Sequence, residues 1–185
     1  MSRSPERLAI LALALTLVAC PTAAAWADPV DTTAGVEDVI APVDDIIAEV
    51  ESLDGAESES KQGEQVTVAL TSDVLFALDK AALTPQARKR LEQVAAKIQA
   101  ESTGGVVRIE GHTDDQGTDA HNDALSLKRA QAVQQALQGK LSGVTFQAKG
   151  FGETRPKLPN IVDGRPVDEN RARNRRVEII FNAKR

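Results

Sequence analysis

An acid and an arginine stand fifteen residues apart in the stretch GHTDDQGTDAHNDALSLKRAQAV, which runs from Gly111 to Val133. Asp114 lies in a polar loop that contains glycine, and Arg129 lies in the segment that follows it. A carboxylate accepts hydrogen bonds from an ammonium group, whereas the planar fork of an arginine binds a carboxylate with two parallel bonds. The two side chains therefore have the chemistry to hold a zwitterion. The alternative is a surface ion pair, which contributes less than about 1 kcal/mol.

The elements around this stretch predict that the two charges converge. A strand is expected to end near His112 and a helix to begin around Asp119, so the loop between them lies at the carboxyl end of a strand, where open α/β sheets bind ligands. Asn122, Ser126 and Arg129 are four and three residues apart and share one face of that helix. Backbone N–H groups at the start of the helix favour an anionic group. Asn122 has an alternative role, a hydrogen bond to the loop itself.

A second interpretation of the same stretch is the metal site of a hydrolase. His112 and Asp114 are two residues apart at a strand end and are expected to point the same way, while His121 lies on the following helix. Three such side chains are suitable zinc ligands. The sequence lacks the arrangement H-E-x-x-H that would supply a catalytic glutamate beside the metal.

The chain from Gln65 to Arg185 predicts one α/β domain of two layers. Its pattern reads strand, helix, strand, helix, strand, strand, and two right-handed crossovers would place both main helices on one face of a mixed sheet. DVLFALDKAAL, residues 73–83, is expected to be extended or to form a short second strand. The predicted strands are VTVAL, VVRIEGHT, VTFQAKG and RRVEIIFN, and the predicted helices are TPQARKRLEQVAAKIQA and AHNDALSLKRAQAVQQALQG.

Five blocks along this domain resemble the peptidoglycan-binding domain of the OmpA-like family, which includes peptidoglycan-associated lipoproteins and flagellar stator proteins. The blocks are LFALDKAALTPQA, GHTDDQG, NDALSLKRAQAV, AKGFGETRP and NRARNRRVEIIF. The resemblance implies non-covalent, non-catalytic binding of the diaminopimelate-containing stem peptide of peptidoglycan, without a cofactor. It assigns ligand binding to Asp114 and Arg129. The supporting candidates are Thr113, Asn122, Arg175 and Arg176.

The first 27 residues predict export. Arg3 and Arg7 precede the apolar run LAILALALTLVA, which is shorter than the roughly 20 residues of a membrane-spanning helix. Cleavage after Ala27 would release a secreted protein. Alternatively, LVAC, residues 17–20, resembles a lipoprotein lipobox, which implies that Cys20 would be acylated and held in a membrane. Because Cys20 is the only cysteine, no disulfide is expected within the chain. We expect a location in the cell envelope, in the cell wall or at a membrane, or secretion.

Residues 28–64 predict an acidic arm and linker. Eleven Asp and Glu residues and no Lys or Arg occur between positions 28 and 60. Apolar residues from Val36 to Leu53 recur every three or four positions, which indicates a partly helical segment that either docks on its own domain or mediates self-association. The stretch from Asp54 to Glu64 is expected to be a flexible linker.

The composition argues against nucleic-acid binding. Residues 61–185 carry twenty Lys and Arg against fifteen Asp and Glu, with an arginine cluster near the C-terminus. Single-stranded nucleic acids are held by aromatic stacking as well as by charge, but the chain has no Tyr and its only Trp lies in the predicted signal.

Overall fold

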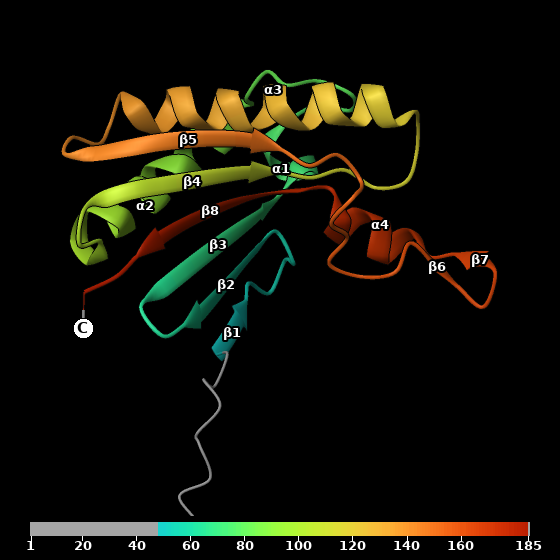
Figure 1. Ribbon diagram of the computed structural model, residues 1–185, viewed down its shortest axis with the longest axis horizontal. Coiled ribbons are helices and arrows are strands. Elements are labelled where there is room, and N and C mark those ends of the chain that lie inside the picture. Colours follow the sequence, from blue (N-terminus) through green and yellow to red (C-terminus); the bar gives the residue numbers. More distant parts are fainter. Residues whose placement is uncertain (1–47, 185) are drawn as a thin grey trace, which may run out of the picture. The chain divides into compact units, whose positions relative to one another are not determined.

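The computed structural model describes residues 48–184, which form a mixed sheet with helices packed on it (Figure 1). The predicted signal peptide, Cys20 and most of the predicted arm lie outside these residues. None of the helices in the described part is long and apolar enough to cross a membrane. The strands are β1 (Ala48–Glu51), β2 (Glu57–Gln62), β3 (Gln65–Thr71), β4 (Gly105–Gly111), β5 (Val144–Gly150), β6 (Ile161–Val162), β7 (Arg165–Pro166) and β8 (Arg176–Asn182). The helices are α1 (Ser72–Leu75), α2 (Pro85–Glu101), α3 (Asp119–Gln138) and α4 (Asp168–Asn174).

The main sheet has six strands in the order β1-β2-β3-β8-β4-β5 (Figure 1). β4 and β5 are parallel and are joined by the crossover through α3, whereas the other neighbouring pairs are antiparallel. The last strand, β8, inserts between β3 and β4, so these two strands run in the same direction on either side of it. The predicted two-layer α/β sandwich with a mixed sheet is confirmed.

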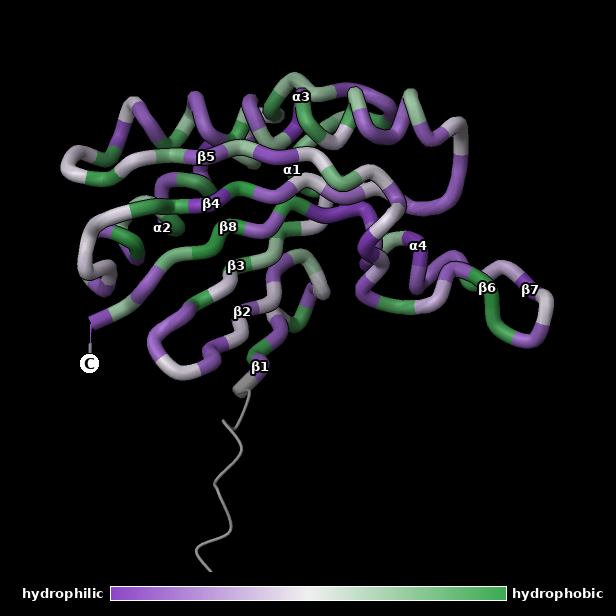
Figure 2. Tube along the Cα trace, viewed as in Figure 1, coloured by the Kyte–Doolittle hydropathy of each residue, from purple (hydrophilic) through white to green (hydrophobic). Residues whose placement is uncertain are grey.

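The core lies between the sheet and the two long helices, and it follows the period-two pattern of the strands. Val66, Val68 and Leu70 of β3 are buried, as are alternate residues of β4 and β8, whereas the intervening residues of β3 are partly exposed. One stripe of α2 closes the same cluster. Figure 2 shows hydrophobic (green) stretches in β3, β4 and β8, the strands at the centre of the sheet. Each fully buried aliphatic side chain stabilises the fold by about 1.5–3 kcal/mol.

Threonines fix where the two long helices begin. Thr84 caps α2 by accepting a hydrogen bond from the Ala87 amide at 3.0 Å, with Pro85 at the first helical position. Thr118 caps α3 in the same way, accepting from the His121 amide at 3.3 Å. The register of α3 is therefore set next to the loop that carries Asp114.

The segment predicted as extended, residues 73–83, differs from the expectation. It begins as the short helix α1 and returns to extended backbone only where Phe76 pairs with Leu83 in an isolated bridge. Leu75, the last residue of α1, and Phe76, which is already extended, are both buried. The change from helical to extended backbone lets both side chains reach the core, whereas consecutive residues of a regular strand point to opposite faces.

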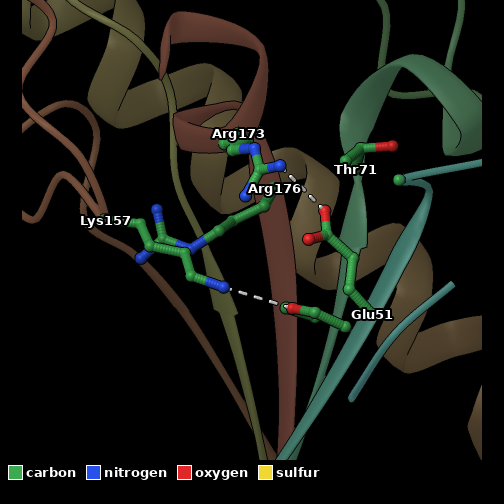
Figure 3. A pocket seen from close by; sticks show the side chains of 8 residues that line it. Glu51, Thr71, Lys157, Arg173 and Arg176 are labelled. Carbon is green, nitrogen blue, oxygen red and sulfur yellow. Dashed lines mark hydrogen bonds and ion pairs between the residues drawn. The ribbon is translucent and has the colours of Figure 1, made fainter. Parts of the chain in front are cut away.

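The prediction of a flexible linker at residues 54–64 is wrong, because this stretch contains β2, which forms a hairpin with β1 at the edge of the sheet. Its acidic side chains have basic partners. Glu59 on one face of the hairpin pairs with Lys97 of α2 at 3.0 Å. On the opposite face Glu51 pairs with Arg173 at 3.2 Å (Figure 3). Glu49 pairs with Lys157 on the same face.

The predicted apolar stripe is only partly described. Val50 and Leu53, at its end, are exposed in the β1 region and do not belong to a helix, while the rest of the stripe lies outside the described residues.

Candidate functional site

A pocket of about 190 Å³ opens at the carboxyl end of β4, beside the first turns of α3. The walls come from the loop after α1, the loop after β4, one face of α3 and the residue that follows α4. The lining residues are Leu78, Asp79, Thr113, Asp114, Gln116, His121, Asn122, Leu125, Arg129 and Arg175. The structure thus brings together Asp114, Arg129, Thr113, Asn122 and Arg175 of the predicted site.

Asp114 is 4% exposed and is held by two donors. One carboxylate oxygen, Oδ1, accepts from the Gln116 amide at 3.1 Å, and the other, Oδ2, accepts from Nη1 of Arg175 at 2.7 Å. A carboxylate has about four acceptor positions, so two bonds leave capacity for a ligand. Hydrogen bonds to Asp73, and then to Asp114, raise the pKa of Arg175.

Arg129 reaches the pocket from α3 and is 5% exposed. Its Nε donates to the carbonyl of Lys80 at 3.0 Å, and its guanidinium lies 5.3 Å from the centre of the Phe76 ring. Burial lowers the pKa of Arg129, while Asp73, Asp79 and Asp114 act in the opposite direction. An arginine remains charged despite such a shift. Of the three side-chain nitrogens of Arg129, only Nε has an acceptor among the described residues. The two terminal nitrogens are therefore free to donate to a ligand.

Two glycines allow α3 to approach the sheet closely enough to place Arg129 beside the strand ends. A Cβ at Gly111 would lie 2.1 Å from the carbonyl oxygen of Ser126, and one at Gly150 would lie 2.5 Å from the amide nitrogen of Leu127. Ser126 then accepts a hydrogen bond from the Gly152 amide at 3.0 Å, which ties the helix to the loop after β5. Ser126 therefore holds α3 against the loop after β5 and does not line the pocket.

Asn122 and Thr113 hold the loop that carries Asp114. Asn122, which is 2% exposed, donates to the Asp114 carbonyl at 3.3 Å and to Glu153 at 2.7 Å. The Thr113 amide donates to the Gly152 carbonyl at 2.9 Å. The alternative role predicted for Asn122, a bond to the loop, is thus present, although its side chain also lines the pocket.

Arg176, the other arginine candidate, does not reach this pocket. Its Nε binds Glu178 at 2.7 Å, and its terminal nitrogens donate to the carbonyls of Asn174 and Arg155. It lines a separate, smaller hollow, together with Lys157 and Arg173 (Figure 3). Arg176 is the first residue of β8, whereas Arg175 precedes that strand at the end of α4, and only Arg175 is bonded to Asp114.

The metal site proposed from His112, Asp114 and His121 is not assembled. His112 packs against the ring of Phe151 at 5.5 Å, and burial lowers its pKa to about 4. His121 instead bonds Asp79 at 2.9 Å. Within residues 48–184, the group of three with metal-ligand spacing is Glu110, His112 and Glu178, which includes neither Asp114 nor His121. Arg176 is already bound to Glu178 there, and two more arginines lie near Glu110, so the group is balanced by positive charge.

Sequence reasoning missed Leu78, Asp79, Gln116 and Leu125 as lining residues. Leu78 and Asp79 lie in the block LFALDKAALTPQA, whose resemblance to the family was noted without any role for single residues. Gln116 lies in the loop next to Asp114, and its contribution to the Asp114 carboxylate is its backbone amide, which residue type does not reveal.

Comparison with known proteins agrees with this architecture. The sequence profile of the OmpA family matches residues 75–175, more than half of the chain. The chain is 33% identical over 118 residues to the putative lipoprotein YfiB of Escherichia coli, with 62% of this chain and 69% of YfiB covered. It is 36% identical over 113 residues to outer membrane protein A of Bordetella avium, with 60% of this chain and 55% of that protein covered.

The fold also matches solved structures. The cell wall anchor of the T6SS from Pseudomonas aeruginosa has a TM-score of 0.58 and 29% identity, over 70% of this chain and 89% of the anchor. The profile match includes both Asp114 and Arg129. The chain belongs to the OmpA family.

Proposed function

We propose that the chain binds peptidoglycan non-covalently and that the pocket takes the diaminopimelate side chain of a stem peptide. The observation that carries the proposal is the convergence of Asp114 and Arg129 in one pocket, each nearly buried and each retaining capacity to bind. The end of a diaminopimelate side chain is a zwitterion, with an ammonium and a carboxylate on the same carbon. The charges of Asp114 and Arg129 complement those of this zwitterion.

Each ligand group has a partner in this scheme. The terminal nitrogens of Arg129 bind the carboxylate, because two parallel N–H groups match its two oxygens. The ammonium donates to Asp114, whose position is fixed by Gln116 and Arg175. Leu78 and Leu125 contribute apolar wall, which suits the methylene chain that links the two ends of diaminopimelate.

The proposed role is binding without catalysis. Covalent catalysis by a hydrolase needs a nucleophile within hydrogen-bond reach of a base. Among the residues that line the pocket, the Thr113 hydroxyl makes no hydrogen bond to His121, which is bonded to Asp79. The other polar groups are carboxylates, amides, arginines and one threonine hydroxyl. This set suits the recognition of charged groups.

The family relationship supports a place in the cell envelope. Two relatives are an outer membrane protein and a putative lipoprotein, and a third, by its description, is a cell wall anchor. This agrees with the export predicted from residues 1–27 and supports an anchoring role. Attachment through Cys20 is one of the two routes that the sequence predicts.

The test is cosedimentation of the purified protein with insoluble peptidoglycan sacculi that contain diaminopimelate. Wild type is expected in the pellet and Asp114→Ala in the supernatant. Glu169→Ala is the matched control, because it removes an exposed carboxylate from α4, away from the pocket lining. Equal pelleting of wild type and Asp114→Ala would remove this pocket from peptidoglycan binding.

A further inference from the structure

Arg175 is shared between two carboxylates that come from different elements. Asp73 of α1 accepts from Nε at 3.3 Å and from Nη2 at 2.8 Å, so it occupies one edge of the guanidinium fork. Asp114 accepts from Nη1 alone, at 2.7 Å. The backbone reinforces this arrangement, because the Ser72 amide donates to the Arg175 carbonyl at 2.7 Å.

The way in which the nitrogens of Arg175 are divided between Asp73 and Asp114 determines how many acceptor positions of Asp114 remain for a ligand. An isolated arginine and carboxylate tend to form two parallel bonds, which engage both oxygens. Here Asp73 holds the edge formed by Nε and Nη2 and thereby fixes the orientation of the guanidinium, in which Nη1 is the one nitrogen bonded to Asp114. The second oxygen of Asp114 accepts a single backbone amide, that of Gln116.

Asp73 also affects the charge of the pocket. Arg129 and Arg175 bring two positive charges to the lining, and Asp114 and Asp79 bring two negative ones. Asp73 lies outside the lining but is in contact with Arg175, and among the neighbouring carboxylates it has the largest electrostatic effect on Arg129. Its removal would leave the surroundings of Asp114 more positive.

We propose that Asp73 is a positioning residue that makes the pocket selective for a zwitterion over a plain carboxylate. It restrains Arg175, and Asp114 thereby stays available to a ligand ammonium. The inference rests on the proposed function and adds a residue that neither the sequence motifs nor the pocket lining includes. Stability is a lesser part of its role, because Asp73 is 57% exposed and exposed ion pairs contribute little to folding.

The experiment compares two soluble tripeptides by titration calorimetry on the full chain. One is L-Ala-γ-D-Glu-meso-diaminopimelate, and the other carries 2-aminopimelate in the last position, so that only the distal ammonium is missing. Asp73→Asn should weaken binding of the first peptide on the order of tenfold, the equivalent of losing one charge-assisted contact, and should leave the second unchanged or tighter. Asp73→Glu should restore part of the discrimination, since it returns the carboxylate.

A second set of variants tests whether Asp73 acts through Arg175. In an Arg175→Gln background, Asp73→Asn should change discrimination much less than it does in wild type, because the group that it restrains is gone. Glu92→Gln is the control, since it breaks another exposed ion pair, with Lys140, away from the pocket lining. It should change neither affinity.

The outcomes separate the two ideas. If Asp73→Asn keeps the wild-type ratio of the two affinities, or weakens both peptides equally, the positioning role is overturned while diaminopimelate binding stands. If wild type does not discriminate between the peptides and Asp114→Ala binds both as well as wild type does, the proposed function fails and the inference fails with it.

Discussion

Asp114 and Arg129 line the same pocket but are bound to different partners in the described structure. Asp114 accepts from Arg175 at 2.7 Å, whereas Arg129 donates its Nε to the carbonyl of Lys80 at 3.0 Å. The two groups are therefore fixed independently, and neither depends on the other for its place. This is the arrangement expected of two binding groups that meet opposite charges on one ligand, and it differs from the structural ion pair that the sequence left as an alternative.

Replacement of Arg129 by lysine should abolish most of the binding to sacculi. Lysine keeps the charge but loses the two parallel donors, so we expect Arg129→Lys to bind at least about tenfold more weakly, nearly as weakly as Arg129→Ala. The exposed neighbour on α3, Lys128→Ala, is the control and should bind as wild type does. Cosedimentation over a range of sacculus concentrations measures the effect. Wild-type binding by Arg129→Lys would show that Arg129 is not the carboxylate partner.

Gly111 should tolerate no side chain. A Cβ at this position would lie 2.1 Å from the Ser126 carbonyl oxygen, and that atom is backbone of α3, which cannot move aside without shifting the helix. We expect Gly111→Ala to lower the free energy of unfolding by about 1–3 kcal/mol or more, the typical range for overpacked cores.

The matched glycine is Gly139, at the end of α3. A Cβ there meets nothing closer than 3.9 Å, and its backbone is in the ordinary helical region, with φ at −70°. Gly139→Ala should be neutral or slightly stabilising. Urea denaturation of the two variants measures the difference, and equal stabilities would contradict the close packing of α3 on β4.

His112 should make the fold less stable in mild acid. Burial lowers its pKa from 6.5 to about 4, so the unfolded chain takes up a proton at a higher pH than the folded chain does. The free energy of unfolding should therefore fall as the pH drops from 6.5 toward 4, and protonation of His112 accounts for at most about 3 kcal/mol of this loss.

The variant His112→Phe isolates this contribution, because it keeps an aromatic ring against Phe151 and cannot be protonated. Carboxylates also change the stability in acid. The bond from Arg171 lowers the pKa of Asp115, for example, so protonation of Asp115 destabilises the fold, but it does so equally in wild type and in His112→Phe. The measured quantity is the difference between wild type and His112→Phe in their loss of unfolding free energy from pH 7 to pH 4.5. We expect wild type to lose more, and identical losses would show that His112 titrates normally.

The sequence predicted the two long helices, the central strands and several of the residues that meet in the pocket, because each of these depends on local patterns. Period-two burial marks β3 and the second half of β4, the cap at Thr84 marks the start of α2, and the spacing from Asn122 to Arg129 marks one helical face. What it could not predict depends on partners that are distant along the chain. The choice of Arg175 over Arg176 follows from how β8 enters the sheet beside β4, and the role of Asp73 follows from a contact with Arg175 that spans 102 residues.

The hairpin formed by β1 and β2 is the largest such difference, and it leads to a further prediction. Its sequence is acidic and weakly apolar, which resembles a linker, but β2 pairs with β3 over six positions and Ala56 is 3% exposed.

A fragment that begins at Gln65, the boundary expected from sequence, would leave β3 as an unpaired edge. It would also remove Glu51, which binds Arg173, and Glu59, which binds Lys97. A fragment that begins at Ala48 keeps them. We expect the shorter fragment to be less stable by a few kcal/mol and more prone to aggregate, because each lost backbone hydrogen bond contributes roughly 0.5–1.5 kcal/mol and the exposed edge can pair with another chain. Urea denaturation and light scattering of the two fragments measure both effects. Two fragments of equal stability would show that the hairpin adds nothing to the fold, and the linker interpretation would then be the better one.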